Sequence, residues 1–106
     1  MLKEQINSLL GFSMKAGKLI SGEELCKKAV QHQQAHLIIL AEDASENTKK
    51  LFLDKTSFYK IPLRFYESKE QIGNSIGKLP RAVIAIQDQG FAKKLMEYID
   101  THIGNQ

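Results

Sequence analysis

Apolar and polar residues alternate along this chain with two spacings, one helical and one extended. Through residues 2–10 the apolar side chains recur at intervals of three and four, which predicts an amphipathic helix. Gly11 and Gly17 are where we expect this helix to loosen and then to stop. Residues 19–20 are expected to form a short extended segment after it.

Three later segments are predicted to be strands. Residues 37–41 and 82–86 are apolar at every position, which is typical of a strand that is buried on both faces. Residues 62–66 alternate instead, and Pro62 favours a strand start or a sheet edge. We therefore expect the two apolar runs to be the central strands and residues 62–66 to be less buried.

Short polar residues mark the predicted helix starts. Ser21 with Glu24 three places later forms a capping-box pair, which predicts a helix that has Gly22 at its first position and extends to about Gln33. The later helices are expected to begin at Asp43 or Ser45, at Ser68 with Gln71, and at Asp88. Their apolar sides are expected to include Leu51 and Leu53 in the third helix and Phe91, Leu95 and Ile99 in the last.

About four strands separated by helices predict an α/β fold, a three-layer α/β/α sandwich around a mixed sheet. Strand order and direction do not follow from periodicity. The length of 106 residues and the hydrophobic content of 42% fit one domain, residues 1–106, that is large enough to bury a real core.

Charge and cysteine content only slightly narrow the range of possible partners and cellular locations. The net charge of +3 favours a polyanionic partner and an ordinary solubilising lysine surface equally, so charge alone does not account for tight nucleic-acid binding. The lone Cys26 excludes an internal disulfide and fits a reducing cytoplasm. The apolar runs are too short to span a bilayer. We expect a soluble, cytoplasmic protein.

The start of the second helix is the candidate binding surface. It combines free backbone N–H groups with the carboxylates of Glu23 and Glu24, and with the ammonium of Lys28 one turn further on. Gly22 would let another backbone approach closely. Folded RNA, which offers both phosphates and base-edge donors, fits this mixture better than a small anion does.

These residues resemble the kink-turn RNA-binding ribosomal protein superfamily, of the L-seven-Ae and L-thirty-e type, and within it the small bacterial YlxQ proteins. The resemblance covers almost the whole chain and is strongest in SGEELCKK, LAEDASENTKK, SIGK and DQGFA. It implies a monomeric, non-catalytic RNA-binding domain without a cofactor, in the cytoplasm or associated with the ribosome. Such a protein would recognise a kink-turn or a related bent internal loop and stabilise its bent form.

The resemblance also implies which residues bind. Superfamily members have a glycine, a variable residue, an Asn-Glu pair and a lysine three places after that glutamate, and these places fall on Gly22, Glu23, Glu24, Leu25 and Lys28. A carboxylate at Glu24 can still accept hydrogen bonds from guanine N–H groups, whereas Leu25 cannot.

A second contact surface is implied at the turn before the last central strand, where an apolar tip would cover an extruded nucleotide. Leu79 and Pro80, after Gly77, retain that apolar character. The full set of residues expected to bind RNA is Gly22, Glu23, Glu24, Lys28, Lys18, Lys78, Leu79, Pro80 and Arg81.

Two alternatives remain open from the sequence. Asp43 and Asp88 each follow a buried strand, and in a parallel sheet they would share one edge, where a Mg²⁺-dependent phospho-acceptor or phosphatase-like site forms. Helix capping is the favoured explanation of both aspartates, because each stands where a helix cap is needed. A protein-interaction module is the other alternative. His32 and His36 are four residues apart but have no evident third ligand, so no metal site is predicted.

Overall fold

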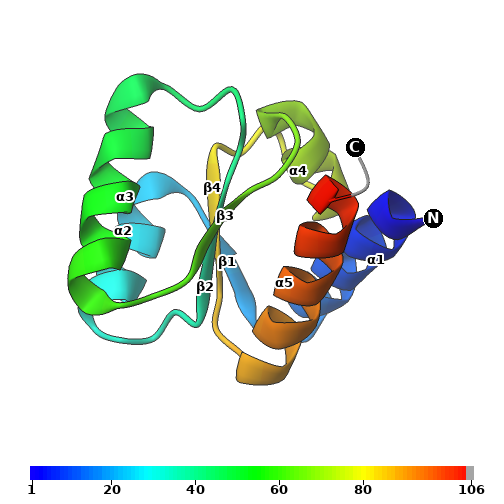
Figure 1. Ribbon diagram of the computed structural model, residues 1–106, viewed down its shortest axis with the longest axis horizontal. Coiled ribbons are helices and arrows are strands. Elements are labelled where there is room, and N and C mark those ends of the chain that lie inside the picture. Colours follow the sequence, from blue (N-terminus) through cyan, green and yellow to red (C-terminus); the bar gives the residue numbers. More distant parts are fainter. Residues whose placement is uncertain (105–106) are drawn as a thin grey trace.

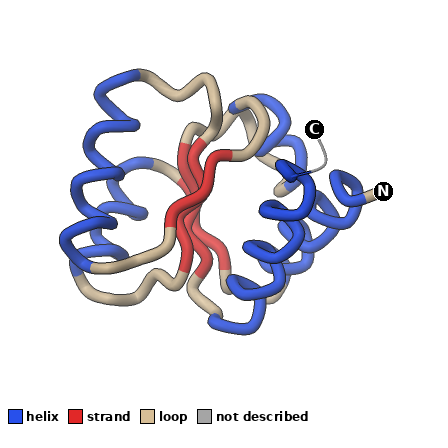
Figure 2. The backbone as a smooth tube through the Cα atoms, in the orientation of Figure 1, coloured by secondary structure: helices blue, strands red, loops and turns tan. Residues whose placement is uncertain are grey.

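The elements follow one another along the chain as α1 (Leu2–Lys15), β1 (Leu19–Ser21), α2 (Glu23–Gln31), β2 (Leu37–Leu40), α3 (Glu46–Tyr59), β3 (Leu63–Phe65), α4 (Lys69–Ser75), β4 (Val83–Ile86) and α5 (Gln89–Gly104). In the computed structural model, which describes residues 1–104, helices α2 and α3 cover one face of the sheet and α1, α4 and α5 cover the other (Figure 1). Figure 2 shows the sheet in red between these two helical layers. The predicted three-layer α/β/α sandwich is confirmed.

The sheet is mixed and has the strand order β1-β4-β2-β3. Strand β4 pairs antiparallel with both β1 and β2, whereas β2 pairs parallel with β3. The two apolar runs are therefore the central strands, and the strand that follows Pro62 lies at the edge, as predicted.

The continuous apolar runs are explained by two separate cores. Along β2, Leu37 and Ile39 pack into the core shared with α1, α4 and α5, whereas Ile38 and Leu40 pack into the core shared with α2 and α3. Strand β4 divides its side chains in the same way, because successive residues of a strand face opposite sides of the sheet. Within residues 1–104 no helix has both the length and the hydrophobicity of a membrane span.

Three of the predicted caps are confirmed. Ser45 Oγ accepts a hydrogen bond of 3.1 Å from Thr48 N, and Ser68 Oγ accepts one of 3.2 Å from Gln71 N. Asp88 Oδ2 accepts from the backbone N–H of Phe91 at 2.8 Å. The choice left open for the third helix is thereby decided in favour of Ser45.

Two details of the helices differ from the prediction. Helix α1 passes through Gly11 without interruption, because its backbone hydrogen bonds continue there and the missing side chain lets the carbonyl of Ser75 come close. In α3 the buried apolar residue is Phe52 and Leu51 packs against the same core, whereas Leu53 lies on the solvent side and is 47% exposed. Neighbouring helical residues point about 100° apart, so a one-residue error in the apolar stripe exchanges inside for outside.

Candidate functional site

The antiparallel pairing of β4 brings four segments to one edge of the sheet. Strands β1, β2 and β3 all end there and β4 begins there. We call this row of strand ends the upper edge; it is distinct from the lateral edge of the sheet, where β3 lies. The start of α2, the loop from β2 to α3, the start of α4 and the turn before β4 all lie at the upper edge, which is the upper part of Figure 1.

The predicted capping box of Ser21 and Glu24 at the start of α2 is wrong. The N-cap is Gly22, with φ 101° and ψ 148°, and among the described residues no side chain caps this helix. Ser21 is instead the last residue of β1, paired with Ile84, so the strand sets its orientation. Gly22 N donates to Val83 O at 3.1 Å, so the helix start is held against β4. Its first-turn N–H groups find no side-chain acceptor within residues 1–104.

The carboxylates of α2 have different surroundings. Glu23 accepts a 3.4 Å hydrogen bond from the hydroxyl of Thr48, which ties it to the start of α3. The Glu24 side chain is 75% exposed and pairs with Lys27, at 3.4 Å on the protein surface. Lys28 is exposed one turn further on. The upper edge thus presents an accessible acceptor, Glu24, beside an accessible cation.

The turn before β4 has a fixed backbone and a free side chain at its tip. Lys78 N donates to Gly73 O at 2.8 Å, and a Cβ added to Gly73 would lie only 2.3 Å from Leu79 O. Arg81 Nη1 donates to the carbonyls of Leu79 and Pro80 at 3.1 and 3.2 Å. Leu79 is nevertheless 78% exposed, so the turn presents its apolar side chain to solvent.

Arg81 connects this turn to the start of α2. Its guanidinium Nε donates to Ser21 Oγ at 3.1 Å, and its backbone N donates to Lys69 O at 3.0 Å. The structure therefore brings together Gly22, Glu23, Glu24 and Lys28 with Lys78, Leu79, Pro80 and Arg81.

Lys18 is the exception among the predicted binding residues. It precedes β1 and lies at the opposite edge of the sheet, where its carbonyl accepts from Gln87 N at 2.8 Å. The three residues of β1 separate it from Gly22, and in an extended strand they span about 10 Å. Lys18 does not belong to the upper-edge site.

Asp43 has a structural role at this site that the sequence did not indicate. Its Oδ1 accepts a 2.8 Å hydrogen bond from Lys69 N, which joins the loop after β2 to the first turn of α4. The predicted cap of α4, Ser68, was a usable local signal, but a partner 26 residues away has no local signature. Gly73 was missed for the same reason, since its neighbour is the turn that follows α4.

The alternative prediction, that Asp43 and Asp88 share one Mg²⁺-dependent site, is wrong. Strands β2 and β4 run antiparallel, so the residues that follow them lie at opposite edges of the sheet. Each carboxylate accepts from a backbone N–H group close to it in space, Lys69 N for Asp43 and Phe91 N for Asp88. The two aspartates cannot hold one Mg²⁺ ion or one phosphoryl group.

Cys26 has a structural role in the core beneath α2. It is fully buried in α2, with its Sγ 3.7 Å from Ile20 O and 3.8 Å from Val83 O. Burial raises the pKa of this thiol to about 12, so it is neutral at physiological pH and a poor nucleophile.

Known proteins match the chain over most of its length. The family model described as "Ribosomal protein L7Ae/L30e/S12e/Gadd45 family" matches residues 4–96. The RNA-binding protein YlxQ of Bacillus subtilis (strain 168) is 47% identical over 92 residues, which cover 87% of this chain and 92% of that protein. The RNA-binding protein YlxQ of Enterococcus faecium is 45% identical over 98 residues, with coverages of 92% and 94%.

Two solved structures have similar folds. A protein of unknown function from Bacillus halodurans C has a TM-score of 0.88 and 44% identity, covering 90% of this chain and 96% of that one. A Giardia lamblia 15.5kD RNA binding protein has a TM-score of 0.78 and 21% identity, covering 94% and 88%. At that identity the second likeness shows the fold alone.

Proposed function

This chain belongs to the ribosomal protein L7Ae/L30e/S12e/Gadd45 family, and on that premise we propose that it is a non-catalytic RNA-binding protein that recognises a kink-turn or a related bent internal loop. Two relatives that are 47% and 45% identical are named RNA-binding proteins, which supports the general activity. The observation that carries the finer proposal is the bond from Arg81 to Ser21, since it holds the start of α2 and the apolar turn at one edge.

In the proposed complex the start of α2 contacts the bent loop. The uncapped N–H groups and the positive end of the helix dipole favour a phosphate beside Gly22. Glu24 accepts from guanine N–H groups of sheared G·A pairs, and Lys28 contacts a neighbouring phosphate. Leu25 is 55% exposed at the place of the superfamily glutamate, so base reading depends on Glu24.

The turn before β4 contributes the apolar part of the interface. Leu79 and Pro80 cover a base that the sharp bend has unstacked, and the fixed backbone of this turn reduces the entropy lost on binding. Because these contacts exist only when the RNA is bent, binding shifts the RNA towards the bent form. We place the protein as a monomer in the cytoplasm, on an RNA of the ribosome or on a regulatory RNA.

A comparison of two duplexes tests the proposal. One carries a kink-turn with tandem sheared G·A pairs, and the other has these pairs replaced by Watson–Crick pairs. We expect gel-shift titrations at one fixed salt concentration to give affinity at least about tenfold higher for the kink-turn, because each misread base pair costs about 1–3 kcal/mol. Fluorescent labels on the two stems should report bending on addition of protein. Equal affinity for both duplexes would overturn kink-turn recognition.

A further inference from the structure

The outer side of α3 carries a hollow that the proposed kink-turn contacts do not use. Its volume is about 470 Å³, and it is lined by Leu51, Asp54, Lys55, Phe58 and Tyr59. These residues are spaced by three, four and seven places, so they form one side of the helix. Helix α3 packs against the sheet through Phe52, and Leu51 and Tyr59 lie between this core and the hollow.

An exposed aromatic ring dominates this hollow. Phe58 is 77% exposed, although a phenyl ring of this size would normally be buried. Its ring meets that of Tyr59 edge-on, with centroids 4.9 Å apart and an interplanar angle of 78°. Tyr59 in turn packs against the core between α2, α3 and the sheet. The Phe58 ring is thus supported from one side and open to a flat ligand on the other.

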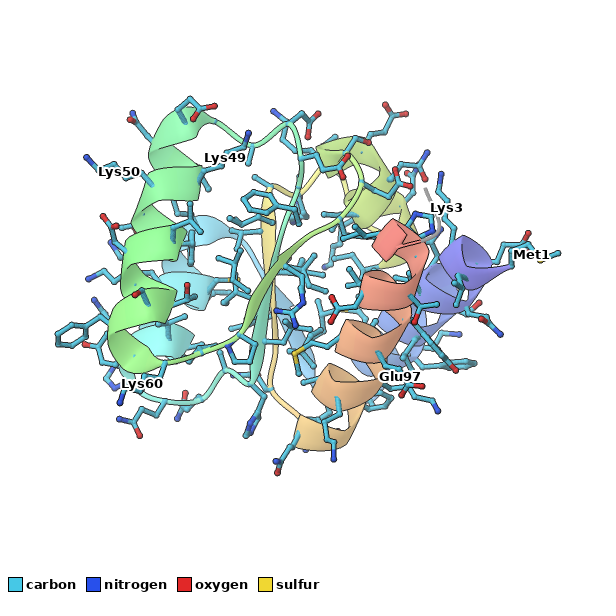
Figure 3. All side chains as sticks on the ribbon, in the orientation of Figure 1. Met1, Lys3, Lys49, Lys50, Lys60 and Glu97 are labelled. Carbon is cyan, nitrogen blue, oxygen red and sulfur yellow. The ribbon has the colours of Figure 1, made fainter. Side chains whose placement is uncertain are left out.

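The lining of the hollow carries one cation and one acid, and further lysines lie at the two ends of α3. Lys55 lines it, and Lys50 and Lys60 lie on the same helix and at its C-cap, whereas Asp54 is the one acid among the lining residues. Figure 3 shows Lys49 and Lys50 near the upper end of α3 and Lys60 at its lower end. An exposed ring flanked by cations complements a ligand that has both an aromatic face and negative charge, which is the chemistry of an unpaired nucleotide.

We propose that this hollow is a second RNA contact, a stacking site for one unpaired base of a strand that continues beyond the bent loop. The inference rests on the proposed function, because it requires RNA at the upper edge. Phe58 stacks on the base, Asp54 accepts from its amino or imino group, and the lysines bind the adjoining phosphates.

The path from the first contact surface to the second follows α3. Glu23 at the start of α2 touches Thr48 in the first turn of α3, so the two surfaces are joined at the upper edge. From Ser45 to Phe58 the helix rises 1.5 Å per residue, which places the stacking site about 20 Å from that edge. An RNA must therefore extend past the bent loop to reach both surfaces, and a minimal kink-turn would miss the second.

The test compares three kinds of RNA probe. They are a blunt-ended kink-turn duplex, the same duplex with a twelve-nucleotide single-stranded tail on one strand or on the other, and the tail alone. For the wild-type protein we expect the better-placed tail to raise affinity about tenfold over the blunt duplex. The Phe58→Ala variant should lose this gain and retain its affinity for the blunt duplex. Phe58→Trp should keep the gain, because its larger ring also stacks.

The matched control is Leu53→Ala, which removes another exposed apolar side chain of α3 outside the hollow. It should leave every affinity unchanged. A direct readout is photo-crosslinking with 5-bromouridine in the tail, which should label the tryptic peptide of residues 56–60 that contains Phe58.

The outcomes separate this inference from the proposed function. If the blunt kink-turn binds no better than its Watson–Crick control, the proposed function fails whatever Phe58 does. If kink-turn binding holds but the tail raises the RNA affinity of neither the wild-type nor the Phe58→Ala protein, the stacking site is overturned. A wild-type dimer in light scattering that becomes monomeric in Phe58→Ala would assign the hollow to a second copy of the chain and would also overturn it.

Discussion

Arg81 donates a hydrogen bond of 3.1 Å from its guanidinium Nε to Ser21 Oγ, although the two residues are 60 positions apart in the chain. The same guanidinium donates to the carbonyls of Leu79 and Pro80, so one side chain orders its own turn and attaches it to the end of β1. The geometry of the upper edge therefore depends on an interaction between side chains as well as on the sheet.

The Ser21–Arg81 pair should be measurable as a coupling energy. We expect Arg81→Ala and Ser21→Ala to be non-additive in the free energy of unfolding, with a coupling of about 0.5–1.5 kcal/mol, the usual range for one hydrogen bond. Urea unfolding of the two single variants and the double variant gives this value. In RNA titrations Arg81→Lys should bind less well than the wild type despite its equal charge, because lysine lacks the guanidinium fork. Strictly additive effects would contradict the coupling.

Gly22 and Gly17 form a matched pair of positive-φ glycines. A Cβ would meet nothing within 4 Å at either position, so substitution by alanine perturbs only the backbone. At Gly22, with φ 101° and ψ 148°, we expect Gly22→Ala to destabilise the protein by about 1–3 kcal/mol. It should also weaken kink-turn binding under conditions where both variants are fully folded. Gly17→Ala, at the opposite edge, should lower stability but leave RNA affinity unchanged; a loss in both variants would remove Gly22 from the site.

Gly73 should control the position of the apolar tip. In Gly73→Ala the new methyl group would lie 2.3 Å from Leu79 O and 2.9 Å from Lys78 O, so the turn has to move. Overpacking of this kind costs about 1–3 kcal/mol, and we expect calorimetry to show a lower melting temperature together with weaker kink-turn binding. Gly104→Ala is the control, because it adds a methyl group to a helical glycine in open space. Its effect should be neutral or slightly stabilising.

Local patterns predicted the elements correctly because they record burial and capping. The apolar runs of β2 and β4 and the caps Ser45, Ser68 and Asp88 all depend on residues within four positions of one another. These signals established a three-layer fold. They also located the start of α2 as a candidate surface, whereas the turn before β4 was implied by the superfamily resemblance.

Contacts between segments that are far apart in the chain could not be predicted from local patterns. The serine of the expected capping box, Ser21, is oriented by β4 and Arg81, whose positions periodicity does not define. The direction of β4 relative to β2 was likewise undefined, so the sequence left open that Asp43 and Asp88 share one edge. Both errors concern pairings that the folded sheet makes between distant segments.

Glu24 should separate RNA binding from stability. Its ion pair with Lys27 is exposed and worth at most a few tenths of a kcal/mol, so Glu24→Ala should unfold at nearly the wild-type urea concentration. If Glu24 reads guanine N–H groups, the variant should lose about tenfold in kink-turn affinity, the low end of what one specific base contact contributes. Glu46→Ala removes a comparable exposed acid, paired with Lys49, from the first turn of α3. It should bind RNA as well as the wild type or slightly better, because a negative charge is lost.

Because of Cys26, the free energy of unfolding should depend on pH in the alkaline range. Burial raises its pKa from an ordinary value of 9.0 to about 12, and burial also raises the pKa of Tyr66, with the charge of Glu67 adding to that shift. For a group whose pKa is higher in the folded state, the stabilising contribution is fully present below the unfolded pKa and is lost as the pH rises towards the folded one. The thiol contribution is therefore complete below about pH 9 and declines between pH 9 and 12.

Cys26→Ala isolates the thiol, because the two proteins share every other titratable group. Between pH 9.5 and 11 the wild-type free energy of unfolding should fall more steeply than that of the variant, by up to about 1.4 kcal/mol per pH unit. The variant's lost packing should only offset its curve by a constant amount, since a methyl group does not titrate. Urea unfolding at half-unit pH steps gives both curves, and parallel curves across this range would contradict a buried, protonated thiol. A thiol reagent should likewise label Cys26 slowly in the native protein and rapidly in urea, because the thiolate forms readily only after unfolding.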